Sequence, residues 1–273
     1  MNNYLMLSSL AVLASFLSFS IHDAHAVTYD LKDQASCQAI SGAWYTSTST
    51  CTISDFSLNS GDSLAVDNSV FPNISLTITD TLDNSGVINN SGSIEISNYG
   101  VFNNDGSIVN YCTVGCVGGT INNDGTITNN NGGTITSNST IVNNGSINNS
   151  GTIIIKNGGT INNYAKFINN DGTVNNYGTI HNNQLSAIIN TGGTIINYAT
   201  IVSDVRGTIT NSGTLKNMCG GTFTSNGDLL GNPVSNISCT TTPKSSTVPE
   251  FPFAMPILVI SFLSMIVFYK TKK

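Results

Sequence analysis

Three aspartates in the middle of the chain stand in the same tripeptide, Asn-Asp-Gly, at Asp105, Asp124 and Asp171. Carboxylates clustered with a basic residue would suit an enzyme that cleaves polysaccharides, where they serve as general acid and base. An aspartate directly before glycine is also typical of a tight turn, because its side chain bonds to nearby backbone. Turn geometry therefore accounts for all three aspartates without catalysis.

The remaining candidates for chemistry are isolated. Asp204 and Arg206 lie two residues apart, and we expect them to form an exposed salt bridge. His181 falls at an outward strand position with no carboxylate partner visible in the sequence, so we expect a surface residue. No Gly-Gly-x-Gly-x-Asp calcium repeat is present. The sequence thus predicts no catalytic residue, no metal site and no cofactor.

Six cysteines follow residue 26, and an even number in an exported chain favours disulfides. Many pairings are open, but sequence proximity favours three local ones. A zinc site is the rival for the C-x3-C pair, which lacks a nearby histidine and so argues against zinc. The favoured pairs are Cys37–Cys51, Cys112–Cys116 and Cys219–Cys239.

The elements that carry these residues are repeats. The phrase Gly-Thr-Ile-x-Asn-Asn returns with variants about twenty times between residues 84 and 230, usually six or eight residues apart. Three such units sum to about 18 to 20 residues, which suits one coil of a three-sided parallel β-helix. We therefore predict an all-β, single-stranded parallel β-helix of seven or eight coils, on the order of 35 Å long. The frequent eight-residue spacings favour a right-handed over a left-handed helix.

The period of two along a strand assigns a role to each residue of the repeat. If isoleucine points inward, the asparagine two positions later also points inward, at the corner. We expect the isoleucines to stack as a core and the asparagine amides to bond from coil to coil. Glycine two residues before isoleucine is expected at the turn, often with positive φ. Ile96 and Ile155 replace the corner asparagine with apolar side chains.

Composition narrows the function. Charged residues make up 9% of the chain, the formal net charge is −6, and no basic residue occurs between Lys32 and Lys156. A nucleic-acid partner is excluded on this basis. An apolar run from Tyr4 to Ile21 precedes Ala24-His25-Ala26, which is typical of a cleaved signal peptide; an uncleaved anchor is the alternative.

Candidate glycosylation sites follow the Asn-x-Ser/Thr pattern. We expect Asn89, Asn138 and Asn148 to be more accessible than an asparagine in a corner ladder. The six sequons are at Asn73, Asn89, Asn138, Asn144, Asn148 and Asn236.

Composition shifts divide the chain into five parts. A hairpin closed by Cys37 and Cys51, with Trp44 in its small core, is expected to start the cap. The last part is expected to carry a transmembrane helix, from Phe253 to Tyr269. The boundaries are 1–26 for the signal peptide, 27–83 for a disulfide-closed cap and first rungs, 84–232 for the repeat array, 233–248 for a Pro/Ser/Thr linker and 249–273 for the C-terminal anchor region.

The C-terminal region resembles the tripartite sorting signals of archaeal surface proteins of the PEF-CTERM type. The matching residues are the motif Pro249, Glu250 and Phe251, then the apolar segment, then the basic tail of Lys270, Lys272 and Lys273. The resemblance covers about the last 25 residues. It implies recognition by an archaeosortase, removal of the helix and transfer to a lipid anchor. A simple membrane anchor is the alternative.

The repeats separately resemble those of filamentous, adhesin-like β-helix proteins. Together these features predict a non-catalytic structural or adhesive protein held at the cell surface with its array outside. Its expected partners are the membrane, the sorting enzyme, and surface glycans or envelope proteins. The alternative is an extracellular carbohydrate-active β-helix enzyme, a polysaccharide lyase or hydrolase.

Overall fold

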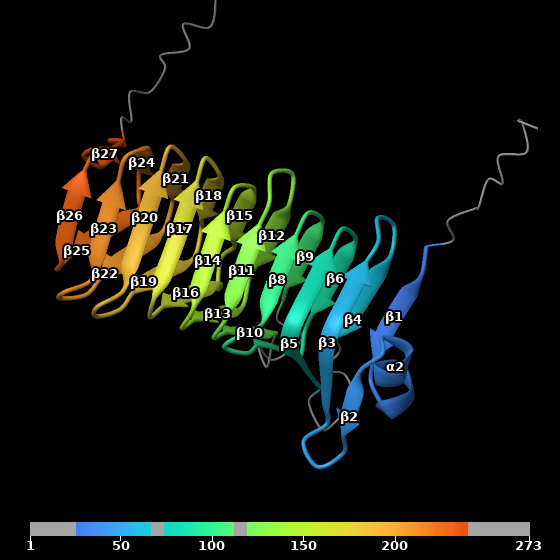
Figure 1. The fold of residues 1–273 in the computed structure, drawn as a ribbon. Helices are drawn as coiled ribbons and strands as arrows, with labels where there is room; N and C mark the ends of the chain where they lie inside the picture. The colour runs from blue at the N-terminus through green and yellow to red at the C-terminus, as the bar shows by residue number, and fades with distance from the viewer. Residues whose placement is uncertain (1–25, 67–73, 112–118, 240–273) are drawn as a thin grey trace, which may run out of the picture. The chain divides into compact units, whose positions relative to one another are not determined.

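The computed structural model describes residues 26–66, 74–111 and 119–239. The chain divides into two compact units, Met1–Ser238 and Cys239–Lys273, and the fold that follows is that of the first. Its described residues form an all-β parallel solenoid of about eight turns, as the repeat predicts. Figure 1 shows the coils lying side by side from the β1 end to the β26 end.

Each regular coil contributes one short strand to each of three parallel faces, which we number in the order in which the chain visits them. Face 1 consists of β1 (Thr28–Leu31), β4 (Ser63–Val66), β6 (Val87–Asn90), β9 (Ser107–Asn110), β12 (Thr134–Ser137), β15 (Thr152–Ile155), β18 (Thr173–Asn176), β21 (Thr194–Asn197), β24 (Thr214–Asn217) and β27 (Ser235–Asn236).

The other two faces are joined into one sheet because two long strands, β3 (Thr50–Leu58) and β5 (Ser75–Asn84), run along both of them. Face 2 continues with β7 (Ser93–Ile96), β10 (Thr120–Asn123), β13 (Thr140–Asn143), β16 (Thr160–Asn163), β19 (Thr179–Asn182), β22 (Thr200–Ser203) and β25 (Thr222–Ser225). Face 3 continues with β8 (Val101–Asn104), β11 (Thr126–Asn129), β14 (Ser146–Asn149), β17 (Lys166–Asn170), β20 (Ala187–Thr191), β23 (Thr208–Asn211) and β26 (Asp228–Gly231).

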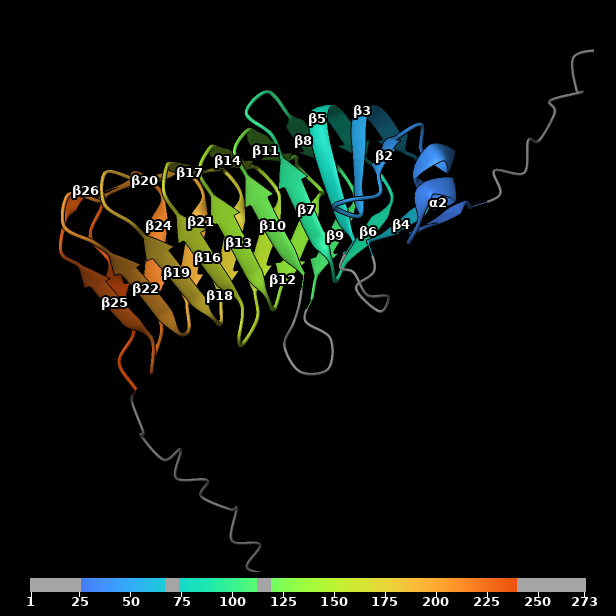
Figure 2. The same cartoon turned by 90° about the horizontal axis from the view of Figure 1, so that it is seen from below.

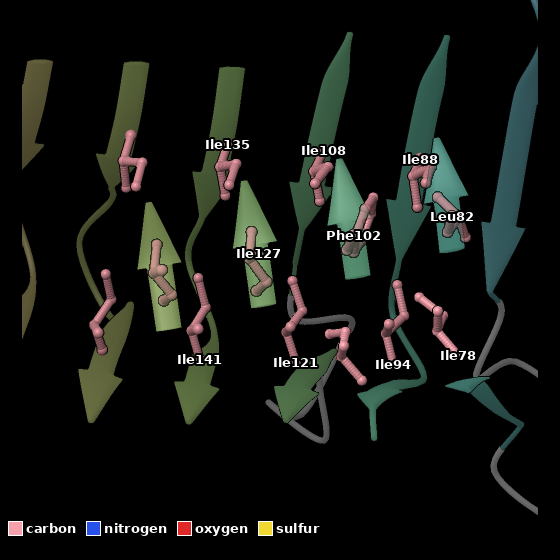
Figure 3. Packing of buried hydrophobic residues seen from close by; sticks show 14 of the residues in the cluster. Ile78, Leu82, Ile88, Ile94, Phe102, Ile108, Ile121, Ile127, Ile135 and Ile141 are labelled. Atoms are coloured by element: carbon pink, nitrogen blue, oxygen red, sulfur yellow. The ribbon is translucent and has the colours of Figure 1, made fainter. Parts of the chain in front are cut away.

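The strands are short because each repeat supplies only two inward residues. In β10, for example, Ile121 and Asn123 are buried while Thr120 and Asn122 are partly exposed. Isoleucine then stacks on isoleucine in register, as Ile121 does on Ile141. Figure 3 shows these apolar side chains following one another along the solenoid on each face. Burial of such side chains, at about 2 to 3 kcal/mol each, is the main stabilising term of the array.

The predicted asparagine ladders are present at the corners. At the corner between faces 3 and 1, the Nδ2 of each asparagine donates to the Oδ1 of the asparagine one coil further on, at 2.7 to 2.8 Å. The same Nδ2 groups also donate to backbone carbonyls, so the buried amides are satisfied. This unbroken ladder runs through Asn84, Asn104, Asn129, Asn149, Asn169, Asn190 and Asn211.

The direction of donation explains two buried oxygens. The Oδ1 atoms of Asn90 and Asn123 lack a hydrogen-bond partner in the described part of the chain. Each belongs to the first asparagine of its ladder, because the preceding coil carries Val66 or Ile96 at that position. A ladder that donates in one direction leaves its first acceptor without an amide donor. Ile96 and Ile155 are themselves fully buried, as their apolar character predicts.

The predicted role of glycine was wrong in one respect. The glycines with positive φ stand three residues before an inward side chain, as Gly132 and Gly158 do, or at other turns. The glycine two residues before isoleucine is required by close approach instead. A Cβ on Gly92 would lie 2.6 Å from the carbonyl oxygen of Ile74, and one on Gly159 would lie 2.5 Å from that of Ser137. Glycine at this position therefore lets successive coils come into backbone contact.

The first rung is covered by the predicted disulfide-closed hairpin. Strand β2 (Ala43–Tyr45) pairs antiparallel with β3, the Cys37–Cys51 disulfide is formed, and Trp44 packs against the core. The sequence did not predict the short helix α2 (Gln34–Ala39), which Asp33 caps by accepting from the backbone N–H of Ser36. Figure 2 shows this helix at the β1 end of the stack.

Candidate recognition site at the corner between faces 1 and 2

The corner between faces 1 and 2, here called corner 1–2, differs from the others in its outer side chains. The residue after each face 1 strand donates its backbone N–H to the previous coil, as Tyr177 does to Ile155 and Tyr198 to Asn176. These residues therefore form a column along the solenoid. The column runs through Ser91, Tyr111, Asn138, Lys156, Tyr177, Tyr198, Met218 and Ile237.

The turns along this column differ in length. Two residues, Tyr177-Gly178, join β18 to β19, and the next coil uses the equally short Tyr198-Ala199. The coil before them and the coil after them need four residues, Lys156–Gly159 and Met218–Gly221, each closed by a backbone hydrogen bond. Glycine with positive φ, Gly158 in the first of these turns, makes the wider turn feasible. The two tight turns are thus flanked by two wider ones.

The two tyrosines at the tight turns stack on each other. The ring centroids of Tyr177 and Tyr198 are 4.5 Å apart and the rings are inclined by only 7°. The two residues are still 44% and 37% exposed. Tyr198 therefore covers one face of the Tyr177 ring and leaves the rest of that ring accessible.

Two hollows meet at Tyr177 and Asn157. The first, of about 340 Å³, lies on the face 2 side and is mainly polar, with Thr160, Thr179 and Thr200 among its lining residues. The second, of about 490 Å³, lies on the face 1 side and is mainly apolar; it is lined by Asn138, Ile154, Lys156, Asn157 and Tyr177.

The electrostatics of corner 1–2 set it apart from a chain with net charge −6. Between Ser91 and Ile237, the described residues of its turns include no carboxylate, while Lys156 is exposed. Lys216, on the outer side of β24, is exposed as well. Burial raises the pKa of the Tyr177 phenol above its usual value, and Tyr198 raises it further. The corner thus joins an aromatic ring, amides, hydroxyls and a cation.

This site was missed by sequence reasoning. The signal that could have found it is the pair Asn176-Tyr177 and Asn197-Tyr198, in which tyrosine follows a ladder asparagine in successive coils. A residue that directly follows the ladder asparagine is the corner residue. Two tyrosines at this position in successive coils are therefore neighbours, and here their rings stack.

His181 lies at the predicted outward position on the surface, but the expectation that it has no carboxylate partner was wrong. Its Nε2 lies 3.1 Å from Oδ1 of Asp204, so it has a carboxylate partner. Asp204 follows β22 at the corner between faces 2 and 3, one coil beyond the outward position of His181 in β19. In the described part of the chain, Asp204 pairs with His181 rather than with Arg206. Only structure brings these two residues together.

The three aspartates of the Asn-Asp-Gly tripeptides all lie in corners, as turn geometry predicts. The backbone N–H of Asp105 donates to Asn84, and that of Asp124 donates to Ile96. Asp171 has a φ of 55° and donates its N–H to Thr191. They occupy two different corners, so the structure does not bring them together into one site. Within residues 26–66, 74–111 and 119–239, no group of three or more His, Cys, Asp or Glu side chains could hold a metal ion.

The remaining sequence candidates are spread over the surface or lie outside the described residues. Cys219 and Cys239 are disulfide-bonded. Cys112, Cys116 and Asn73 lie outside the described residues.

Asn89, Asn138 and Asn148 are partly buried and so are more accessible than the buried ladder asparagines, as predicted, while Asn144 and Asn236 are exposed. Asn144 donates to Asp124 and Asn236 accepts from Asn217. The signal peptide, the linker beyond Cys239, the sorting motif Pro249–Phe251 and the basic tail lie outside the described residues. No helix among the described residues is long and apolar enough to cross a membrane.

No protein family model, curated protein or solved structure matches this chain.

Proposed function

We propose that the protein is a non-catalytic rod that is exported and held at the cell surface, where it serves a structural or adhesive role. The observation that carries this proposal is the uniform use of the inward positions for stacking. Isoleucine and asparagine ladders fill the inside of the described coils. The outward positions are left mainly to threonine, serine and asparagine, which suit contact with a hydrated partner.

The disulfide between Cys37 and Cys51 supports export, because such bonds persist in oxidising compartments. We include the sorting step in the proposal: recognition of Pro249, Glu250 and Phe251 by an archaeosortase, followed by loss of the helix. We also include the right-handed winding, since the eight-residue spacings would disturb a strict hexapeptide register. Both rest on the sequence.

A second candidate function has one observation in its favour. The His181–Asp204 pair, with the two side chains 36% and 32% exposed, would serve as the acid–base unit of an extracellular polysaccharide lyase or hydrolase. Under the structural proposal it is a surface ion pair. Cleavage of any member of a polysaccharide panel, abolished in His181→Ala and in Asp204→Ala, would favour the enzyme over the rod.

Mass spectrometry of protein extracted from the surface of intact cells tests the main proposal. We expect a mature N-terminus after Ala26, loss of the segment beyond Pro249, and release of array peptides when intact cells are treated with protease. An intact segment from Phe253 to Tyr269 would contradict the sorting step. Array peptides that appear only after lysis would contradict the surface location.

A further inference from the structure

We propose that corner 1–2 is a binding site for an oligosaccharide, with an acidic sugar beside Lys156; the inference rests on the proposed surface role. The first observation that supports this proposal is the accessible part of the Tyr177 ring. Tyr198 covers one face of that ring, and both hollows meet at Tyr177 and at Asn157 in the turn one coil earlier. A ligand ring seated there contacts the tyrosine on one side and the Lys156–Gly159 turn on the other.

The two hollows match the two surfaces of a sugar. A pyranose ring presents apolar C–H groups on its faces and hydroxyls around its edge. The hollow on the face 1 side is mainly apolar, with Ile154, the Tyr177 ring and the stem of Lys156, and suits the C–H face. The hollow on the face 2 side offers Thr160, Thr179 and Thr200, whose hydroxyls both donate and accept hydrogen bonds.

Charge determines which sugar is favoured. The absence of carboxylates from the described turns of corner 1–2 between Ser91 and Ile237 removes the repulsion that an anionic ligand would meet elsewhere on this acidic chain. Lys156 supplies the single cation at the apolar hollow. A single lysine is too little for a nucleic acid, whose binding depends on neutralising several phosphates. For a sugar that bears one carboxylate, a single lysine is sufficient.

The extent of the hollows limits the length of the ligand. Their lining residues come from four successive coils, from Asn138 to Thr200, so the site extends over about three coil spacings, on the order of 14 Å. The site therefore takes a few sugar units of a longer chain. Tyr198 is a positioning residue, because it holds the Tyr177 ring and is not among the residues that line the hollows.

A glycan array containing acidic and neutral oligosaccharides, probed with the full purified chain, tests the site. We expect binding with a preference for uronic-acid-containing members and a Kd on the order of 1 mM or below. Tyr177→Ala should weaken binding about tenfold, since it removes the aromatic surface that both hollows share. Lys156→Gln should remove the preference for acidic members. Tyr198→Ala should weaken binding, and Tyr198→Phe, which keeps the stacked ring, should restore it.

Tyr164→Ala is the matched control. Tyr164 is a corner tyrosine exposed to 51% at the corner between faces 2 and 3, and its removal should leave binding unchanged. The proposal fails if the wild type binds no glycan, if Tyr177→Ala and Tyr164→Ala bind alike, or if only neutral glycans bind. A single cooperative unfolding transition well above the temperature of the glycan array excludes misfolding as the cause of any loss. A silent array with surface exposure intact would refute only this site; binding by a chain that stays inside the cell would refute only the surface role.

Discussion

Corner 1–2 and the corner between faces 3 and 1, here called corner 3–1, are built from the same repeat yet differ inside and outside. Inside corner 3–1 seven asparagines form an unbroken ladder. Inside corner 1–2 the ladder is interrupted by Ser137 and by the fully buried Ile155. Outside, corner 3–1 carries small polar and acidic residues such as Asp105 and Ser150, whereas corner 1–2 carries Lys156 and the tyrosine pair.

This difference shows that the buried residues and the outer residues of a corner vary independently of each other. The interruption at Ile155 lies directly beneath the candidate site, since Lys156 follows it and a Cβ on Gly159 or Gly178 would lie within 3.1 Å of its Cγ2. Apolar packing thus replaces the polar ladder where the outer residues form the hollows. We interpret corner 3–1 as the more stabilising corner and corner 1–2 as the recognition corner.

The largest effect should come from breaking the unbroken ladder. Asn149→Ala removes a side chain that accepts from Asn129 and donates to Asn169 and to the carbonyl of Gly151. Because it leaves several buried polar groups without partners, we expect a loss of about 3 kcal/mol in the free energy of unfolding. Urea denaturation followed by circular dichroism measures it.

The neighbouring outward residue provides the control for that experiment. Asn148→Ala should change the free energy of unfolding by less than about 0.5 kcal/mol, because Asn148 faces outward. Equal losses in the two variants would show that a ladder asparagine contributes no more to the free energy of unfolding than an outward asparagine. Corner 3–1 would then not be the more stabilising corner.

A smaller difference in stability is expected between variants of Ile96 and Ile155, the two buried isoleucines that interrupt asparagine ladders. In Ile96→Asn the new amide can donate to Oδ1 of Asn123, which now has no partner. In Ile155→Asn the acceptor ahead, Oδ1 of Asn176, already accepts from the N–H of Gly178. We expect both variants to lose stability, and Ile155→Asn to lose about 1 kcal/mol more.

These two positions are well matched, because each side chain is fully buried and each lies against two corner glycines. Equilibrium unfolding of the two variants side by side gives the difference. If Ile96→Asn is the more destabilised of the two, the directional account of the ladder is incorrect.

The outer tyrosines should matter little for stability. Tyr177→Ala removes one exposed stacking contact, for which we expect a loss of about 1 kcal/mol. Tyr99→Ala, at a side chain exposed to 89%, should cost less than that and sets the baseline. A loss in Tyr177→Ala as large as that in Asn149→Ala would make corner 1–2 a structural element rather than a recognition surface.

Acid should destabilise the coil where corner 3–1 begins. The N–H of Val27 donates to the Asp62 carboxylate at 2.8 Å, which holds the pKa of that carboxyl below its usual 3.8. A lowered pKa in the folded state means that this stabilisation is present above pH 3.8 and is lost as the pH falls through the lower, folded value. Hydrogen exchange of β1 amides should therefore accelerate in that range. Asp62→Asn should show little of this pH dependence; an unchanged profile would reject the assignment.

Alkali should act on corner 1–2. Burial and then Tyr198 raise the pKa of Tyr177 above 10.0. The neutral phenol is therefore favoured by the fold, and its contribution is complete below pH 10.0 and lost as the pH rises through the higher, folded value. Phenolate absorbance should show one tyrosine titrating late. In Tyr198→Ala that late titration should move back toward the ordinary value; if it does not, the two rings do not interact in solution.

The repeat alone was sufficient to predict the coils, because each of its residues has one geometric role. Ile121 and Asn123 had to point inward once the strand period was set, and their burial follows. The hairpin around Trp44 followed from the cysteine spacing. By contrast, α2 was not predictable from an array, since its capping by Asp33 is purely local.

The site could be predicted far less well. Its hollows depend on a wide turn at Asn157 lying beside a tight one at Tyr177, and turn length has meaning only once the coils are aligned. The pairing of His181 with Asp204 likewise depends on which coils are neighbours. Sequence spacing gave a role to each position of the repeat, whereas contacts between coils became visible only in the structure.

Footprinting of the tyrosines tests most directly whether corner 1–2 is the recognition corner. The full chain would be modified at tyrosine with and without the best glycan from the array, and each tyrosine quantified by mass spectrometry. The account predicts protection of Tyr177, with a smaller effect at Tyr198, and none at Tyr164. Protection of Tyr164 to the same extent, or no protection at Tyr177 at saturating glycan, would contradict it.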